Sequence, residues 1–127
     1  MTRGTAGSLV VVAVVCGGLA VTGAGVAKPR PPTTLHLKAD AAGKLKFNKT
    51  TLSAKAGKVS LVMKNPGSSG QQHGIAVKGN GLDKDGKIVN PGKTSTVTAT
   101  LKAGTYSFYC PVLGHRAAGM NGKLTVK

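Results

Sequence analysis

The sequence predicts an all-β protein, a Greek-key β-sandwich or barrel of about seven to eight strands. Beyond the first 27 residues, threonine and valine alternate repeatedly, and no amphipathic helix of three turns appears. Nineteen glycines and six prolines divide the chain into short segments. With 127 residues, the chain has room for one ordinary domain.

The expected strands lie between clusters of glycine, proline, asparagine and aspartate, which favour turns. Seven strands are expected at residues 34–38, 44–48, 58–64, 72–78, 94–101, 105–110 and 122–127, and a weaker pattern predicts an extended segment at 50–54. Successive side chains of a strand point to opposite faces. By this rule, His73 and Cys110 are in phase with the apolar residues of their strands and point inward at strand ends.

Residues 1–27 have the pattern of a secretory signal peptide. Arg3 is the only charge, an apolar run follows at 9–16, and small residues lead to an expected cleavage after Ala27. We therefore expect an exported protein that is periplasmic, extracellular or on the outer face of the cytoplasmic membrane.

Two alternatives remain open for this segment. Residues 9–27 could stay as an uncleaved membrane anchor, since they just reach the length that spans a bilayer. Cys16 could instead be acylated, although the bulky residue before it disfavours a lipoprotein site. Residues 28–33 are rich in proline and predict an extended tether, and the domain is expected to cover 34–127.

The strong positive charge limits the classes of partner. The whole chain carries a formal charge of +15, and residues 28–127 keep 17 basic residues against Asp40, Asp83 and Asp85, a balance of +14. Export and the lack of an aromatic stacking platform disfavour nucleic acid as a partner. Most lysines alternate with apolar residues and are expected to form a solvated face. A subset could steer an acidic protein partner.

Three residues that can bind a soft metal ion lie in one loop between two expected strands. These are Cys110, His115 and Met120, which offer a thiolate, an imidazole and a thioether. Two histidines and a cysteine with a weak axial methionine form the blue-copper electron-transfer site. The second histidine must come from elsewhere, and His73 has the right strand phase.

Other interpretations of these residues fit less well. Taken singly, a buried cysteine, a core histidine or a core methionine would be commoner than a metal ligand, but four residues in one pattern favour copper. Zinc rarely takes a thioether ligand. A binuclear copper centre needs a second cysteine, where Gly114 stands. A cysteine nucleophile lacks an orienting carboxylate. His36 alternates with two leucines and is expected to point outward.

The motif resembles that of the cupredoxin family, which includes plastocyanins, azurins and rusticyanin-like proteins. The likeness covers nearly all of residues 34–127. It implies that His73 is the upstream ligand, Cys110 the thiolate, His115 the second imidazole and Met120 the axial ligand of one copper ion. The four residues on each side of His115 make a long loop, closest to rusticyanin-like members.

The resemblance implies a mononuclear type 1 copper protein that carries single electrons outside the cytoplasm and is not an enzyme. Its partners would be redox proteins with acidic docking surfaces, and the protein would be a monomer. Alternatives are a copper storage or delivery module for an extracytoplasmic oxidase, or a structural β-sandwich with a vestigial site.

The sequence departs from the family beside the upstream ligand. Many members follow that histidine with asparagine, whose side chain ties the two ligand loops together, whereas this chain has Gly74. Pro111 also removes one backbone donor near the cysteine sulfur. We expect donors from elsewhere in the His73 loop to compensate.

Overall fold

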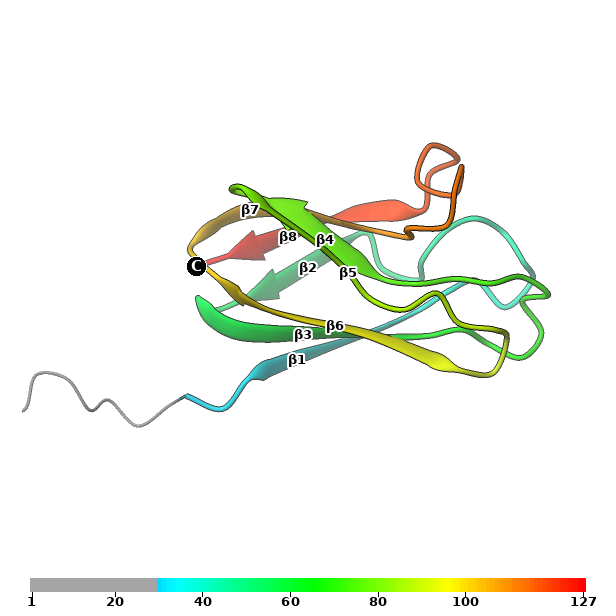
Figure 1. Ribbon diagram of the computed structural model, residues 1–127, viewed down its shortest axis with the longest axis horizontal. Helices are drawn as coiled ribbons and strands as arrows, with labels where there is room; N and C mark the ends of the chain where they lie inside the picture. The colour runs from blue at the N-terminus through cyan, green and yellow to red at the C-terminus, as the bar shows by residue number, and fades with distance from the viewer. Residues whose placement is uncertain (1–29) are drawn as a thin grey trace, which may run out of the picture.

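The computed structural model describes residues 30–127. The predicted signal peptide and the start of the predicted tether lie outside these residues, so both stay predictions. Within the described part, all regular structure is β, with eight strands in two sheets that pack face to face (Figure 1). No helix among residues 30–127 is long and apolar enough to cross a membrane. The all-β sandwich predicted from the sequence is confirmed.

One sheet has three strands and the other has five. The smaller sheet runs in the order β1 (Thr33–Lys38), β3 (Gly57–Lys64) and β6 (Thr94–Leu101). The larger sheet runs in the order β2 (Thr51–Ala54), β8 (Asn121–Val126), β7 (Gly104–Tyr109), β4 (Ala76–Gly79) and β5 (Leu82–Asp85). Parallel pairing joins β1 to β3 and β2 to β8, and the remaining neighbours pair antiparallel.

The core lies between the two sheets and follows the alternation of side chains. Every second residue of β3 is buried, and β6 shows the same period. Phe47 and Phe108 meet across the core with ring centroids 5.7 Å apart. The apolar side chains that are almost fully buried include Leu37, Val59, Leu61, Met63, Ile75, Val77, Val97, Leu101, Tyr106 and Leu124.

Three loops gather at one end of the sandwich, which we call the metal-site end. They are residues 65–75 between β3 and β4, residues 86–93 between β5 and β6, and residues 110–120 between β7 and β8. Strand β1 begins at the other end, where the chain enters the domain (Figure 1). Strand direction therefore brings segments that are far apart in sequence together at the metal-site end.

The strand predicted at residues 44–48 is wrong, although its burial pattern is right. Phe47 is buried and Leu45 is half-buried, but the segment makes only one isolated bridge, between Phe47 and Ala39. Next to this bridge, the side chain of Asn48 accepts the Lys38 amide over 2.8 Å, so a side chain takes the place of a backbone partner. A polar residue that satisfies the backbone in this way ends strand pairing.

The strand predicted at residues 72–78 begins only at Ala76. The backbone of Ile75 does not pair with a strand, because its carbonyl accepts the Gly86 amide and its amide donates to the Ser95 hydroxyl. Strand β5 was not predicted. It lies at the edge of the larger sheet, pairs only with β4 and exposes most of its side chains. An exposed edge strand needs no alternation of apolar residues. The sequence pattern therefore did not distinguish β5 from the turn residues on each side of it.

Candidate metal centre

His73 is held by two backbone hydrogen bonds to Val89 in the neighbouring loop. The His73 amide donates to the Val89 carbonyl over 3.1 Å, and the Val89 amide donates back over 2.8 Å. The His73 side chain is completely buried, as its strand phase predicted. Hydrogen bonds between the loop of His73 and the loop of Val89 thus fix the His73 backbone, although β4 begins only at Ala76.

The loop between β7 and β8 positions the other three residues. The Cys110 amide donates to the Met120 carbonyl over 3.1 Å, and the Met120 amide donates to the His115 carbonyl over 3.1 Å. Gly114 and Gly119 have φ values of 83° and 113°, the left-handed region that glycine adopts without strain. The loop therefore folds back so that the backbones of Cys110 and Met120 pair at its base, and both side chains are fully buried.

The structure brings His73, Cys110 and His115 together. The Cys110 Sγ lies 3.9 Å from His73 Nδ1 and 3.6 Å from His115 Nδ1. One ligand atom from each of the three residues lies within 4.8 Å of the others. A nitrogen and a sulfur bound to one ion at about 2.0 and 2.3 Å in a trigonal plane would be about 3.7 Å apart. The observed spacings therefore fit a shared metal ion.

The donor set also fits copper chemically. Met120, predicted as the fourth ligand, is buried beside Cys110 and His115 and would add a thioether to two imidazoles and a thiolate. A weak axial thioether is typical of blue-copper sites, whereas zinc is bound by cysteine, histidine and carboxylate side chains. Among the partners that residues 30–127 offer, the buried His73 Nε2 has none, and folding tolerates this cost where a function needs the residue. His36 is exposed on β1, outside this cluster, as predicted.

Burial sets the protonation of the two buried residues. Burial, and secondarily the charge of His115, lowers the pKa of His73 below its ordinary 6.5, which favours the neutral imidazole that binds metals. Burial raises the pKa of the Cys110 thiol, while the amides of Gly74 and Val112 act in the opposite direction. Metal binding must therefore displace a proton from Cys110.

Gly74 supplies the sulfur donor that Pro111 cannot. Its amide donates to Cys110 Sγ over 3.4 Å, so the expected compensation from the His73 loop is confirmed. The structure also explains the glycine. A Cβ at position 74 would lie 3.1 Å from the Pro111 ring and 3.1 Å from the Lys87 carbonyl oxygen. Glycine at 74 and proline at 111 are thus two halves of one close contact.

Asn65 joins the loop of His73 to the loop of Val89, a role that was not predicted from the sequence. It is fully buried, and its amide group donates to the carbonyls of Gln71 over 2.8 Å and Val89 over 3.0 Å. Its side-chain oxygen accepts the Ser69 hydroxyl over 2.6 Å. Val89 is also the backbone partner of His73. Asn65 therefore braces the His73 loop, and its hydrogen bonds reach the loop of Val89 rather than the loop that carries Cys110.

A second brace lies on the other side of His73. The buried Ser95 hydroxyl accepts the Ile75 amide over 3.3 Å and donates to the Lys87 carbonyl over 2.5 Å. The sequence did contain a sign of this role, because Ser95 is a polar residue on the otherwise apolar inward face of β6.

Tyr109, directly before the cysteine, anchors the edge of the larger sheet. Its hydroxyl is 2.8 Å from Asp83 Oδ1 and 3.2 Å from Asp85 Oδ1 and donates to these carboxylates. Burial and then the two carboxylates raise the pKa of Tyr109 to about 12, so the phenol stays protonated. The Arg116 guanidinium lies 4.2 Å from the centre of the Tyr109 ring and links the ligand loop to β7.

Comparison with known families matches this fold and site. A profile of the Cupredoxin-like domain family covers residues 9–126. The chain belongs to the cupredoxin-like family. The match covers both sheets, the three convergent loops and part of the segment that the structure leaves undescribed.

Solved cupredoxin structures include auracyanins similar to this chain. Auracyanin A, a "blue" copper protein from Chloroflexus aurantiacus, is 30% identical with a TM-score of 0.61, and the alignment covers 76% of this chain and 99% of that one. Auracyanin from Roseiflexus castenholzii is 26% identical with a TM-score of 0.66, covering 75% and 97%. Auracyanin B is 27% identical with a TM-score of 0.66, covering 75% and 88%.

A more distant similarity shows the fold and no more. A copper nitrite reductase from Nitrosomonas europaea is 22% identical with a TM-score of 0.59, and the alignment covers 76% of this chain and 41% of that one. A comparison with curated proteins found no match.

Proposed function

We propose that this cupredoxin is a one-electron carrier that holds a single copper ion through His73, Cys110, His115 and Met120. The observation that carries the proposal is the convergence of the Cys110 sulfur with two imidazole nitrogens at 3.9 and 3.6 Å. Similarity to auracyanins, one of which is described as a "blue" copper protein, supports the same role.

The surrounding protein would keep the ligands in one arrangement. Copper supplies the electron chemistry when it is bound, because it cycles between Cu(I) and Cu(II). Asn65 and Ser95 fix the loop that carries His73, and backbone hydrogen bonds fix the loop that carries Cys110. Ligands that cannot rearrange between oxidation states lower the reorganisation cost of electron transfer.

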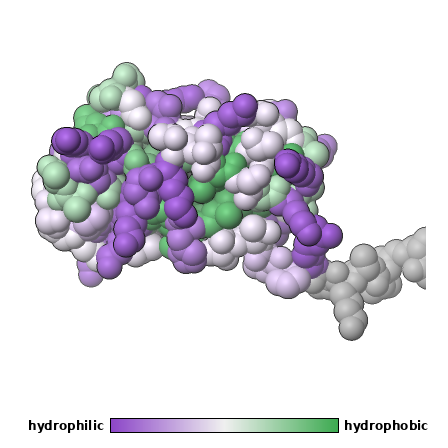
Figure 2. Space-filling model, turned by 180° about the vertical axis from the view of Figure 1, so that it is seen from behind, coloured by the Kyte–Doolittle hydropathy of each residue, from purple (hydrophilic) through white to green (hydrophobic). Residues whose placement is uncertain are grey.

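His115 is the proposed port for electrons. It is half-buried, and its loop exposes apolar side chains, with Leu113 99% exposed. We call the surrounding residues the apolar patch: Pro111, Val112, Leu113, Ala117 and Ala118. At the end of the molecule farthest from the grey atoms, which is the metal-site end, green and pale green residues lie among purple ones (Figure 2). A partner that docks on the apolar patch would come close to the His115 ring.

An enzymatic role for the cysteine has little support. A nucleophilic cysteine needs access to its substrate and a lowered pKa. The Cys110 side chain is completely buried, and burial raises the pKa of its thiol. These properties favour a metal ligand over a nucleophile.

The charge supports an acidic redox partner outside the cytoplasm. Residues 28–127 carry a balance of +14, which would steer an acidic protein toward the domain. Rates of electron transfer to such a partner should fall as ionic strength rises. A rate that does not depend on salt would remove the support for this docking.

Titration of the purified protein with Cu(II), followed by visible absorption, tests the proposal. We expect one equivalent to produce an intense thiolate-to-copper band that bleaches and returns through redox cycles. Cys110→Ser should abolish the band, while His36→Gln, a matched change of an exposed histidine, should keep it. Tight Cu(I) binding without the band would favour copper delivery instead. Absence of binding would favour a structural β-sandwich.

A further inference from the structure

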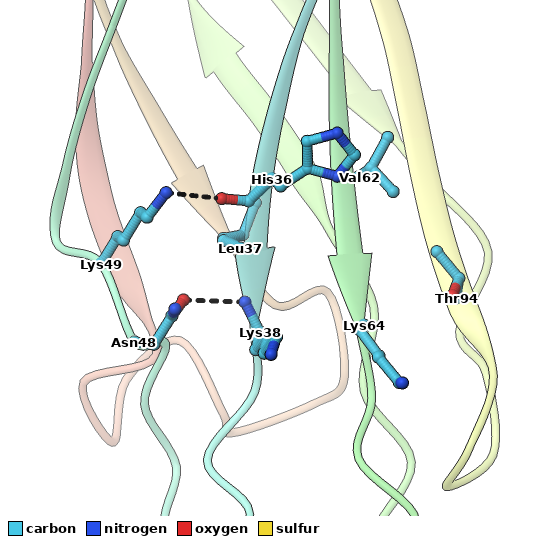
Figure 3. A pocket seen from close by; sticks show the side chains of 8 residues that line it. All are labelled: His36, Leu37, Lys38, Asn48, Lys49, Val62, Lys64 and Thr94. Carbon is cyan, nitrogen blue, oxygen red and sulfur yellow. Dashed lines mark hydrogen bonds between the residues drawn. The ribbon is translucent and has the colours of Figure 1, made fainter.

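A concavity on the outer face of the smaller sheet has no role in the proposed copper site. It has a volume of about 330 Å³ and lies where β1, β3 and β6 approach the metal-site end (Figure 3). We call it the lysine pocket, and its lining residues are His36, Leu37, Lys38, Asn48, Lys49, Val62, Lys64 and Thr94. None of the four proposed copper ligands lines it.

The charge of the lysine pocket is unbalanced. Lys38 on β1 is directly opposite Lys64 on β3, and both side chains are exposed on the same face. Like charges in this arrangement destabilise a sheet. Within residues 30–127, the ion pairs are Lys46 with Asp40 and Lys78 with Asp83, so neither involves a pocket lysine. The fold therefore keeps an unfavourable pair of charges that an anion would relieve.

Local contacts already order the wall of the lysine pocket. The Lys49 ammonium donates to the His36 carbonyl over 3.0 Å, which holds a third cation beside β1. Asn48 is fixed by the bond from the Lys38 amide to its side-chain oxygen (Figure 3). His36 is paired in register with Val62 on β3, and the two side chains lie next to each other in the same view. Part of the ordering cost of binding is thus met before a ligand arrives.

We propose that the lysine pocket binds a small, multiply charged phosphate anion, either free or as the exposed phosphate of a lipid headgroup. Its lining includes three lysines, a histidine and a threonine, whose ammonium, imidazole and hydroxyl groups are potential donors to phosphate oxygens. Its volume is at the lower end of the range for small-ligand sites, about 300–1,000 Å³. Charge-assisted hydrogen bonds to phosphate are among the strong ones in proteins.

The first test is calorimetric titration of the full chain with pyrophosphate at fixed ionic strength. The double variant Lys38→Gln/Lys64→Gln should lose about a hundredfold in affinity, because each lysine contributes a charge-assisted bond worth about tenfold. The control Lys58→Gln/Lys102→Gln removes the same charge from exposed positions outside the pocket and should bind within about twofold of the wild type.

Thermal unfolding with and without pyrophosphate provides a second measure of binding if calorimetry gives too little heat. Without anion, Lys38→Gln/Lys64→Gln should unfold at a temperature no lower than the wild type, because the opposed charges are gone. With pyrophosphate, the wild type and the control should gain stability and the pocket variant should not. Equal loss of binding or of stabilisation in both double variants would overturn the proposal, because affinity would then follow net charge alone.

Vesicle binding separates the two sources of phosphate. Vesicles of phosphatidylcholine with phosphatidic acid should bind the wild type and release it on addition of pyrophosphate if a lipid headgroup also enters the lysine pocket. Vesicle binding that pyrophosphate does not displace, alongside loss of pyrophosphate binding in the pocket variant, would assign the pocket to the soluble anion. If the wild type bound neither pyrophosphate nor the vesicles, the site would be refuted, whatever the result of the copper titration.

Discussion

The backbone amide of Gly74 donates to the Cys110 sulfur over 3.4 Å, and the Pro111 ring lies where a Cβ of residue 74 would approach it to 3.1 Å. This contact joins the two ligand loops directly. A Cβ at position 74 would lie 3.1 Å from the Pro111 ring and from the Lys87 carbonyl oxygen, closer than most real Cβ contacts, so Gly74→Ala should destabilise the protein by about 1–3 kcal/mol. It should also lower the reduction potential, since a longer N–H···S bond stabilises the electron-rich reduced state less.

Urea unfolding and cyclic voltammetry measure these two effects. Gly67→Ala is the matched control, since a Cβ there meets nothing within 4 Å. Pro111→Ala should relieve part of the crowding, so the double variant Gly74→Ala/Pro111→Ala should lose less stability than the sum of the single changes. Additive losses would show that the contact with Pro111 does not explain the glycine.

The Asn65 brace gives a second prediction. Asn65→Ala removes one buried acceptor and two donors that hold the loop around His73, and should cost about 2–3 kcal/mol of stability. Hydrogen exchange of the Val89 amide, which donates to His73, should accelerate. Asn90→Ala removes only an exposed hydrogen bond from Gln72 and should cost under about 0.5 kcal/mol. Equal costs for both variants would contradict the bracing role.

The proposed axial ligand can be tested by Met120→Leu. The side chain is fully buried, and leucine has a similar volume, so the fold should survive with a cost under about 1.5 kcal/mol. Loss of the weak thioether should raise the reduction potential while the blue band persists. Met63→Leu, a buried methionine on β3, is the control and should leave the potential unchanged. An unchanged potential in Met120→Leu would argue against this ligand.

The apoprotein should lose stability as pH falls. Burial lowers the pKa of His73 below its ordinary 6.5, so the unfolded chain binds more protons than the folded one in this range. Stability therefore rises with pH where the unfolded histidine titrates, and falls from about pH 7 to about pH 5. Urea unfolding of the metal-free protein should show this slope, and His73→Gln should reduce it. A slope that His73→Gln leaves unchanged would contradict this assignment.

Alternation of side chains was sufficient to predict the strands that lie over the core. It identified β3, β6 and β7 because each needs one apolar face. It failed for β5, an edge strand whose residues are mostly exposed. It also failed at residues 44–48, where a side chain of Asn48 competes with the backbone for Lys38. Periodicity reports burial, and strand pairing depends in addition on which partner satisfies the backbone.

The candidate site was predictable where its chemistry is local. Cys110, His115 and Met120 lie in one loop, and the strand phase of His73 correctly placed it inward. The residues that support them were not predictable, because Asn65 looks like an ordinary turn residue until Gln71 and Val89 approach it. Hydrogen bonds between residues far apart in the chain do not produce a periodic pattern in the sequence.

The chain enters and leaves the described domain at the same end. Thr33 and Lys127 line one shallow pocket there, while the loops with His73 and His115 lie at the opposite end (Figure 1). An electrode or vesicle that captures the protein by a tag after Lys127 should therefore leave the His115 end facing solution. Soluble partners would reach it freely, and direct transfer to the supporting surface would be slow.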